Sequence, residues 1–340
     1  MKKSMLFFGL IVITINYLSA QTNKDSVPVI PEKHTVIAHI FSEAYYSFND
    51  NVIPRQAFRI TRGLLGYVYN YNDRLKALLI YDVTRTTREI VVRDTAGNIL
   101  PVEYKDGSRY TGFLKLAEID YKLTDWLEIG VGQMMTKQYT PLRDYWGYSY
   151  ISNTFEEING FGMPADFGVM LMFRPTKNIE YTFGVFNGEG PFQYQDASGN
   201  MLISNNLEIK FANNLLLKLY HDYDKGTIGS EVPRTTYQVY LAYLTPKLRF
   251  GASYHQIDNP KFVEDKWWGV SLHGNAVISP KFDLLFRCDY MGKSNLYEDS
   301  QYWIGGFQYK PMKRLSVSLN FRHRLPENQP QIFMNMEIRY

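Results

Sequence analysis

The histidines are the side chains of this chain best suited to proton transfer or metal binding near neutral pH. Six are present: His34, His39, His221, His255, His273 and His323. Their spacing matches no metal-ligand motif, and the chain has no glycine-rich phosphate loop, nucleophile elbow or paired-cysteine motif. We therefore predict no metal site and no cofactor.

Two of the histidines stand beside residues of the kinds that form hydrolase sites. Ser253 precedes His255 by two positions, and His221 adjoins Asp222. A Ser/His/acid site needs all three groups in contact, whereas adjacent residues of a strand point to opposite faces. The sequence leaves a hydrolase acting on lipid open as an alternative, and otherwise predicts histidines that line a lumen or loops.

A regular alternation of apolar and polar residues indicates which elements must position these side chains. The last segment has Ile332, Met334, Met336, Ile338 and Tyr340 at alternate positions, with Phe333, Asn335, Glu337 and Arg339 between them. Side chains of a strand point to opposite faces with period two. The segment is thus predicted to be a strand that separates an apolar medium from a polar one.

The first twenty residues have the pattern of a secretory signal peptide. Lys2 and Lys3 precede an apolar stretch over residues 5–17, and small residues end the segment at Ala20. The apolar stretch is too short to span a membrane. We predict a signal peptide over residues 1–20, a short periplasmic N-terminal segment over residues 21–34 and a barrel over residues 35–340.

The composition narrows the class of the exported chain. The formal charge is +3 and falls to +1 without Lys2 and Lys3, which argues against a nucleic-acid binder. The single cysteine, Cys288, cannot form an internal disulfide. No apolar run of eighteen residues follows residue 20, while aromatic residues, which favour membrane interfaces, make up 16%. A high content of aromatic residues, the alternation of apolar and polar residues and the lack of an apolar run of eighteen residues together favour an outer-membrane β-barrel.

Sixteen segments are predicted to be strands. They cover residues 35–48, 55–70, 75–84, 110–122, 126–137, 165–174, 179–187, 206–211, 215–223, 234–244, 248–256, 267–278, 281–290, 301–309, 315–324 and 331–340. Short turns such as 245–247, with Pro246, alternate with connections that are mostly longer. Around Arg59, Thr61 and Arg62 the alternation is irregular, which predicts a β-bulge.

This pattern predicts an all-β fold, a transmembrane antiparallel β-barrel of about 16 strands with short periplasmic turns and longer extracellular loops. The barrel must be closed because unpaired backbone groups at a sheet edge would cost several kcal/mol each in hydrocarbon. A soluble β-sandwich also alternates, but sixteen strands would normally form two domains. No linker rich in Pro, Gly or Ser divides the chain.

The chain resembles the sixteen-stranded outer-membrane porins, and in particular the phosphate-selective porin O/P-like group. The resemblance rests on the signal peptide, the sixteen-strand scheme, the terminal aromatic Tyr340, and the segments 144–148 (DYWGY) and 165–169 (ADFGV). It implies that Tyr340 is the mark recognised by the barrel-assembly machinery. It also implies an outer-membrane location in contact with lipid, and a homotrimer.

The third long connection, residues 138–163, is the candidate constriction. In the porins that the chain resembles, this loop folds into the barrel and narrows the channel, and selectivity needs a charged constriction. The candidate loop residues are Arg143, Asp144, Tyr145, Trp146, Tyr148, Glu156 and Glu157. The candidate residues of the opposing basic wall are Arg287, Arg322, Arg324 and Arg339. Alternatively, the loop covers the outer mouth and these arginines pair with Asp283, Asp289 and Glu337.

The predicted function is a porin for the passive diffusion of small hydrophilic solutes or ions, not an enzyme. Eight basic and six acidic residues occupy inward positions of the clearer strands, which predicts at most a weak preference for anions. The basic ones are Arg174, Lys210, Lys218, Arg249, Arg287, Arg322, Arg324 and Arg339, and the acidic ones are Glu180, Glu208, Asp222, Asp283, Asp289 and Glu337. An outer-membrane barrel enzyme and a structural or adhesive barrel are the alternatives.

Overall fold

The computed structural model describes residues 33–340 apart from residues 53, 91–102, 212–213, 231 and 293–298. The predicted signal peptide over residues 1–20 and nearly all of the predicted segment 21–34 lie outside the described residues. The first strand begins at Lys33, two residues before the predicted start of the barrel.

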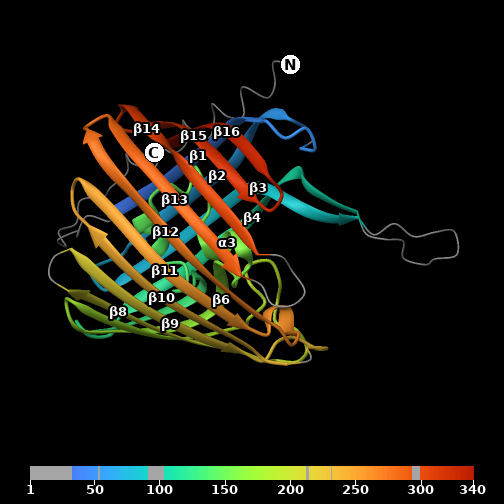
Figure 1. The fold of residues 1–340 in the computed structure, drawn as a ribbon. Coiled ribbons are helices and arrows are strands. Elements are labelled where there is room, and N and C mark those ends of the chain that lie inside the picture. Colours follow the sequence, from blue (N-terminus) through green and yellow to red (C-terminus); the bar gives the residue numbers. More distant parts are fainter. Residues whose placement is uncertain (1–32, 53, 91–102, 212–213, 231, 293–298) are drawn as a thin grey trace, which may run out of the picture. The chain divides into compact units, whose positions relative to one another are not determined.

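The described residues form a closed barrel of sixteen antiparallel strands in which each strand pairs with its neighbours in sequence and β1 pairs with β16 (Figure 1). The strands are β1 (Lys33–Ser47), β2 (Gln56–Asn70), β3 (Leu75–Ile90), β4 (Glu103–Lys122), β5 (Leu127–Met135), β6 (Ala165–Thr176), β7 (Ile179–Phe186), β8 (Leu202–Phe211), β9 (Leu215–Asp224), β10 (Arg234–Leu244), β11 (Leu248–Asp258), β12 (Lys266–Ser279), β13 (Phe282–Gly292), β14 (Ser300–Met312), β15 (Leu315–Leu325) and β16 (Gln329–Arg339). The predicted fold class is confirmed. Closure leaves no sheet edge without a hydrogen-bonding partner strand.

The alternation along each strand has the direction that the sequence predicts. In β16 the side chains of Met334 and Ile338 point outward and are 51% and 43% exposed, whereas Asn335 and Glu337 point into the lumen and are 0% and 3% exposed. Large apolar side chains therefore form the outer surface and polar side chains the inner one. A soluble β-sandwich would have the opposite arrangement, with its apolar faces buried between two sheets.

The irregular second strand contains the predicted bulge. Phe41 of β1 pairs with Arg62, and the next residue, Ser42, pairs with Ile60. Thr61 is therefore an extra residue in β2, which returns the side chains on either side of it to their proper faces.

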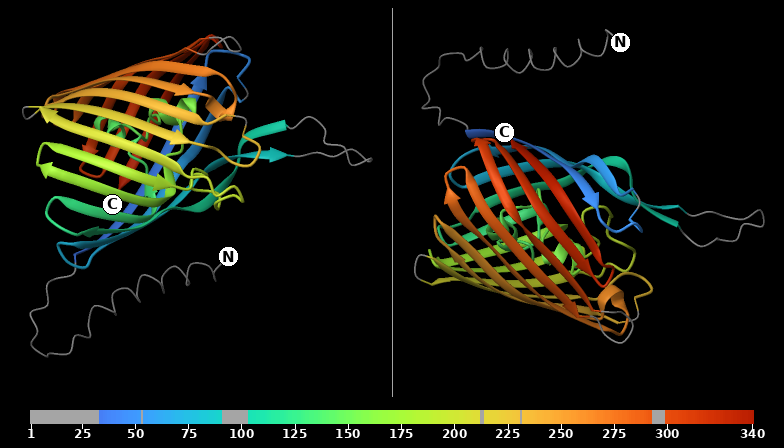
Figure 2. Two further views of the ribbon diagram at one scale, coloured as in Figure 1. Left: turned by 90° about the horizontal axis from the view of Figure 1, so that it is seen from below. Right: turned by 45° about the horizontal axis from the view of Figure 1, so that its top comes forward.

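The hairpin of β3 and β4 is longer than predicted. The sequence predicts strands over residues 75–84 and 110–122 only, but residues 85–90 and 103–109 also pair as strands, with Arg88 opposite Lys105. The hairpin extends beyond the rim of the barrel in both views of Figure 2. Backbone pairing can continue outside an apolar medium, where an alternating apolar face is no longer needed.

The helices that the structure describes are short and lie in the connections. They are α2 (Leu142–Trp146), α3 (Phe155–Asn159) and the 3₁₀ turn η1 (Pro260–Phe262). Within the described residues, no helix is both long enough and apolar enough to cross a membrane.

Candidate functional site

The connection between β5 and β6, residues 136–164, is here called the lumen loop. Its α2 helix ends at Gly147 and its α3 helix ends at Gly160, and both glycines adopt the left-handed conformation, with φ values of 71° and 68°. The sequence Thr154-Phe155-Glu156-Glu157 forms a capping box at the start of α3, where the Glu157 carboxylate accepts the N–H of Thr154 at 3.3 Å. Local capping signals thus shape the loop into two compact turns.

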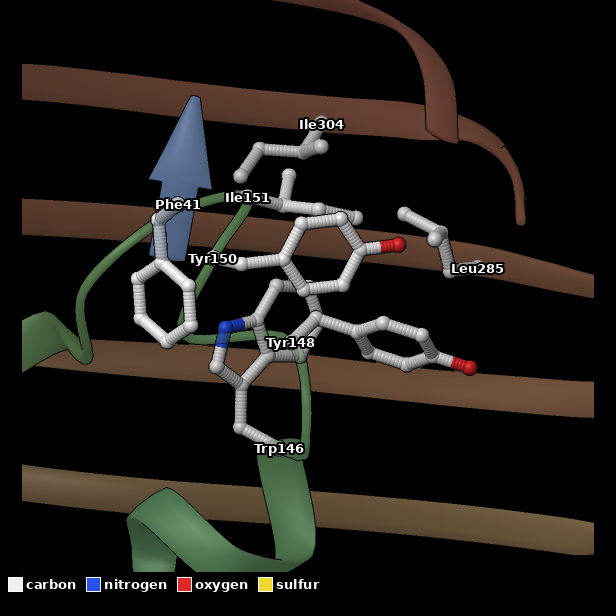
Figure 3. Close-up of a cluster of buried hydrophobic side chains, with 7 residues drawn as sticks. All are labelled: Phe41, Trp146, Tyr148, Tyr150, Ile151, Leu285 and Ile304. Atoms are coloured by element: carbon white, nitrogen blue, oxygen red, sulfur yellow. The ribbon is translucent and has the colours of Figure 1, made fainter. Parts of the chain in front are cut away.

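The lumen loop lies inside the barrel and packs on inward-facing side chains of the strands. Figure 3 shows Trp146, Tyr148, Tyr150 and Ile151 of the loop gathered with Phe41, Leu285 and Ile304 of β1, β13 and β14. Elsewhere, Phe155 and Phe161 of the loop pack on Ile257, Trp267 and Met291, and Leu142 packs on Leu216, Tyr240 and Ala242. The loop therefore has its own hydrophobic contacts inside an otherwise polar lumen.

Hydrogen bonds join the same loop to the wall. The Tyr150 hydroxyl donates to Oε1 of Gln308 at 2.8 Å, and Nδ2 of Asn335 donates to the Tyr150 carbonyl at 3.2 Å. Burial raises the pKa values of Tyr148 and Tyr150, so both phenols stay protonated and able to donate.

Arg287 is the most extensively bonded of these anchors. Its guanidinium is almost completely buried, pairs with Asp289 at 2.6 Å and donates a hydrogen bond to the carbonyl of Asn153 in the loop. It also lies over the ring of Trp146, 5.5 Å from the ring centroid. Arg287 therefore fastens the lumen loop to β13.

A second buried polar group surrounds Glu156. Gln238 donates from Nε2 to Glu156 at 2.6 Å, while Nζ of Lys218 donates to Oε1 of Gln238 at 2.6 Å and to the Gln138 carbonyl at 2.8 Å. Burial raises the pKa of Glu156 to about 7. Glu156 and Gln138 thus connect both ends of the loop to β9 and β10.

Ser253 and His255 meet Glu156 in an arrangement that resembles a hydrolase triad. Nε2 of His255 lies 2.7 Å from the Ser253 hydroxyl, and Nδ1 lies 3.8 Å from Glu156. Lys218 can only donate hydrogen bonds, so the side-chain oxygen of Gln238 must face Lys218. The amide N–H groups of Gln238 therefore face Glu156 and Nδ1 of His255, and the distance to Nδ1 is 3.3 Å. Nδ1 then accepts, and the proton resides on Nε2, where it is donated to Ser253.

This protonation is the reverse of what a hydrolase needs, because the general base must present an unprotonated Nε2 to the serine. His255 is also fully buried, and the adjoining cavity measures about 10 Å³, room for about one water molecule. Ser253 and His255 therefore meet a carboxylate, but in a sealed packing and hydrogen-bonding cluster, whereas His221 lies against the exposed Tyr237 and takes no part in it.

Two cavities beside the lumen loop share lining residues, whereas a third, of about 360 Å³, is lined by three cations and three carboxylates near the β6–β7 turn: Arg174, Lys177, Lys210, Asp125, Glu180 and Glu208. A turn-side cavity of about 840 Å³ reaches the short turns, and a loop-side cavity of about 290 Å³ reaches the long loops. Phe41 and Ser149 border both of them. The lumen loop is fastened mainly to the wall of β9–β16 and also packs on Phe41 of β1, and the turn-side cavity is bordered by this loop, by β1–β4 and by the turn-side ends of β11–β16.

Cationic side chains outnumber carboxylates in the turn-side and loop-side cavities. Within the described residues, the turn-side cavity is lined by Lys115, Arg143, Arg249, Lys310, Lys313, Arg314 and Arg339 against Asp144, Asp283 and Glu337. The loop-side cavity is lined by Arg62, Arg322 and Arg324 against Glu43. Ten cations thus face four carboxylates.

Cations of both cavities converge on one buried carboxylate. The carboxylate of Asp82 is fully buried and forms ion pairs with Lys115, at 2.8 Å, and with Arg62, at 3.2 Å. Two cations on a single carboxylate leave an excess of positive charge at this point, and burial and then the nearby Arg62 guanidinium lower the pKa of Arg143 in the loop.

The structure places the predicted loop residues in two groups. Arg143, Asp144 and Tyr148 line the turn-side cavity. Tyr145 packs against Tyr240, and Trp146 is buried with its Nε1 donating to the Ser152 carbonyl.

Glu156 and Glu157 do not line either cavity. Glu156 is buried against Gln238, and Glu157 caps α3, so neither carboxylate forms the acidic wall that the loop was expected to supply.

The predicted basic wall divides in the same way. Arg322 and Arg324 line the loop-side cavity and Arg339 the turn-side cavity, where it pairs with Glu337 at 2.7 Å. Arg287 lines neither of them, since Asp289 and Asn153 hold it in the wall.

Several lining residues were missed from sequence. Arg62 lies next to the bulge at Thr61 in β2, and Lys115 is itself an extra residue at a register shift between β3 and β4, so the alternation that tells inward from outward positions is interrupted at both; Glu43 lies on β1 opposite Arg59. Lys313 and Arg314 lie in a short turn, which strand periodicity does not place. Among the described residues no group of three or more His, Cys, Asp or Glu side chains could hold a metal ion.

No protein-family model matches the chain, and no curated protein matches it significantly. Solved structures of outer-membrane proteins, by contrast, are similar over almost the whole chain. An anion-selective porin from Comamonas acidovorans is 10% identical with a TM-score of 0.66, covering 91% of this chain and 100% of that one. OmpF of Salmonella typhi, in complex with daunomycin, is 11% identical with a TM-score of 0.65, covering 91% and 98%.

OmpT, an outer membrane protein of Vibrio cholerae solved in a trimer form, is 11% identical with a TM-score of 0.59, covering 91% of this chain and 99% of that one. At such low identities the similarity concerns the fold. The chain therefore has the closed sixteen-stranded β-barrel fold found in outer-membrane porins.

Proposed function

We propose that the protein is an outer-membrane porin through which small hydrophilic solutes and ions diffuse passively. The observation that carries this proposal is the pair of lumen cavities beside the lumen loop, which Phe41 and Ser149 both border. A barrel of this width holds an aqueous channel unless it is filled, and here one loop fills only part of it. The apolar outer surface requires a lipid environment.

We further propose a preference for anions. Ten cations against four carboxylates line the turn-side and loop-side cavities, and Lys115 of the one and Arg62 of the other both pair with Asp82. An ion that passes 5 Å from one uncompensated charge in water gains or loses about 0.8 kcal/mol. Inorganic phosphate is the first solute to test, because the sequence resembles phosphate-selective porins.

Planar bilayers test the proposal. Purified protein should give discrete conductance steps, and a barrel that carries no current would refute it. Arg143→Gln should lower the anion-to-cation permeability ratio several-fold in 0.1 M salt, where screening is moderate. Arg143 has only a long hydrogen bond, 3.4 Å to Ser149, so the substitution costs the fold little. Arg74→Gln, in an exposed turn outside the lining, is the matched control and should leave the ratio unchanged.

The same proposal includes export and assembly. Residues 1–20 direct secretion, and the last strand, ending in the exposed Tyr340, is the segment presented to the barrel-assembly machinery. A homotrimer is part of the proposal, supported by the sequence resemblance. Cleavage after Ala20 and cross-linking in membranes test these two parts separately.

The alternatives have less support. A barrel enzyme would use Ser253, His255 and Glu156, which lie in a sealed cluster with the histidine proton on the wrong nitrogen. A purely structural barrel would be filled by side chains, whereas two cavities remain open.

A further inference from the structure

An apolar groove runs across the outer face of the barrel, near the short turns. Its volume is about 700 Å³, and it crosses β10–β14, which lie side by side in Figure 1. Its outward-facing walls are large apolar side chains: Tyr243, Leu248, Phe250, Leu284, Phe286 and Phe307. Its floor is low because the outward-facing Ala276 is small.

The turns next to this groove carry positive charge and no negative charge. Lys247 lies in the turn between β10 and β11, and Lys281 in the turn between β12 and β13. Both side chains are exposed. Residues 243–250, 276–282 and 307–315 contain no Asp or Glu.

Backbone hydrogen bonds hold these turns beside the neighbouring strands. The Val277 N–H donates to the Lys247 carbonyl, and the Lys310 N–H donates to the Lys281 carbonyl, both at 2.8 Å. The two lysines are therefore fixed above the end of the groove, at the depth where an apolar surface gives way to water. Long lysine side chains in such positions extend toward lipid head groups.

The turns that join β2 to β3 and β4 to β5 have a different charge pattern. They contain Asp73 and Asp125 beside Arg74 and Lys122, so that positive and negative charges alternate. The β10–β14 side thus combines the apolar groove with neighbouring turns that are basic and contain no acidic residue.

We propose that this groove binds one anionic phospholipid of the leaflet that meets the short turns. The acyl chains lie over Ala276 between the aromatic walls, and the phosphate group lies between Lys247 and Lys281. Charge complementarity selects this occupant, because a zwitterionic lipid brings its own cation to a rim of cations. This inference rests on the proposed membrane location, but it concerns a surface outside the lumen.

Native mass spectrometry of the intact protein, released from vesicles of equal parts phosphatidylglycerol and phosphatidylcholine, tests the proposal. The protein should retain one phosphatidylglycerol in preference to phosphatidylcholine. Lys247→Gln combined with Lys281→Gln should lower this preference by about tenfold or more. Ala276→Leu fills the groove and should reduce retention of both lipids. Lys177→Gln, in the turn between β6 and β7, should have no effect.

Single-channel conductance, measured on the same preparations, separates failure of this inference from failure of the porin proposal. Neither Lys247 nor Lys281 lines a lumen cavity, so conductance should be unchanged in their variants. Retention unaffected by the double substitution, or reduced equally by Lys177→Gln, would overturn the inference. The inference would also be overturned if the protein formed lipid-free oligomers that the Ala276→Leu substitution dissociates. The groove would then be covered by a second copy of the chain.

Discussion

Replacement of Arg287 by methionine tests whether buried contacts hold the lumen loop against the wall. Arg287 pairs with Asp289 at 2.6 Å and donates to the Asn153 carbonyl. Methionine fills much of the same volume beside Trp146 but can make neither interaction. The substitution therefore affects the wall and the loop at once, and the two effects can be calculated separately.

The wall loses a buried ion pair. Asp289 keeps only the Ser271 hydroxyl, at 2.6 Å, in a position that is 3% exposed. Leaving a buried charge without its partner costs about 3–5 kcal/mol in free energy of unfolding. The loop loses a charged hydrogen bond worth about 1.5–3 kcal/mol, so the fraction of molecules with a detached loop should rise about 10- to 100-fold.

A double variant separates these effects. Arg287→Met combined with Asp289→Asn removes the unpaired charge and should recover much of the free energy of unfolding. It still lacks a donor for the Asn153 carbonyl, so the loop should stay loosened. Urea unfolding measures the first quantity.

The alkylation rate of a cysteine introduced at Ser152 measures the second, in a chain where Cys288 is replaced by serine. Ser152 borders the loop-side cavity but is only 8% exposed, so an increase of its reaction rate over that of the chain with Arg287 reports detachment of the loop. The rate should rise about tenfold or more in both the single and the double variant. An unchanged alkylation rate, together with a lower free energy of unfolding, would show that Arg287 stabilises the wall alone and does not hold the lumen loop.

Two further predictions concern the lumen loop and its surroundings. A methyl group at Gly147 would lie 2.2 Å from the guanidinium of Arg249, whereas one at Gly160 would meet no atom within 4 Å. Both glycines have positive φ, so Gly160→Ala should lower the free energy of unfolding by about 1–2 kcal/mol. Gly147→Ala should lower the free energy of unfolding further and should also lower the anion preference, because it displaces Arg249. Equal effects of the two substitutions in bilayer and urea measurements would contradict this prediction. A fluorophosphonate probe should leave Ser253 unlabelled, with His255→Ala making no difference, and labelling that depends on His255 would revive the hydrolase alternative.

The barrel was predictable because a repeated physical constraint acts on every strand. An apolar outer face requires apolar residues at every second position of a strand, and tight turns favour residues such as Pro246. Strands and turns can therefore both be recognised in the sequence. Pairing of β1 with β16 followed from the need to close the sheet. The extended hairpin of β3 and β4 was missed because backbone pairing outside the apolar zone leaves no such signal.

The interior of the barrel was less predictable, because contacts between the loop and the wall depend on residues far apart in sequence. One signal was available. Leu285, Ile304 and Tyr240 are apolar residues at inward positions, and each contacts the lumen loop. Such exceptions to a polar lumen mark the surface on which a loop packs.

The charge of the passage could not be counted from periodicity alone. Lys218 and Arg287 are inward but serve as buried anchors, while Lys313 and Arg314 line the turn-side cavity from a turn. The sequence count of eight basic to six acidic residues therefore understated the excess of positive charge that the cavities show.

A cysteine introduced at Ser149 tests whether solutes pass through the two lumen cavities that this residue borders. In a Cys288→Ser background, a negatively charged methanethiosulfonate reagent should react with this cysteine and lower single-channel conductance in one step. It should also shift the reversal potential toward cations, because a fixed negative charge then borders both cavities. The same reagent at Ile228→Cys, in an exposed loop, should leave both quantities unchanged. Full modification at Ser149 with unchanged current and reversal potential would contradict the account.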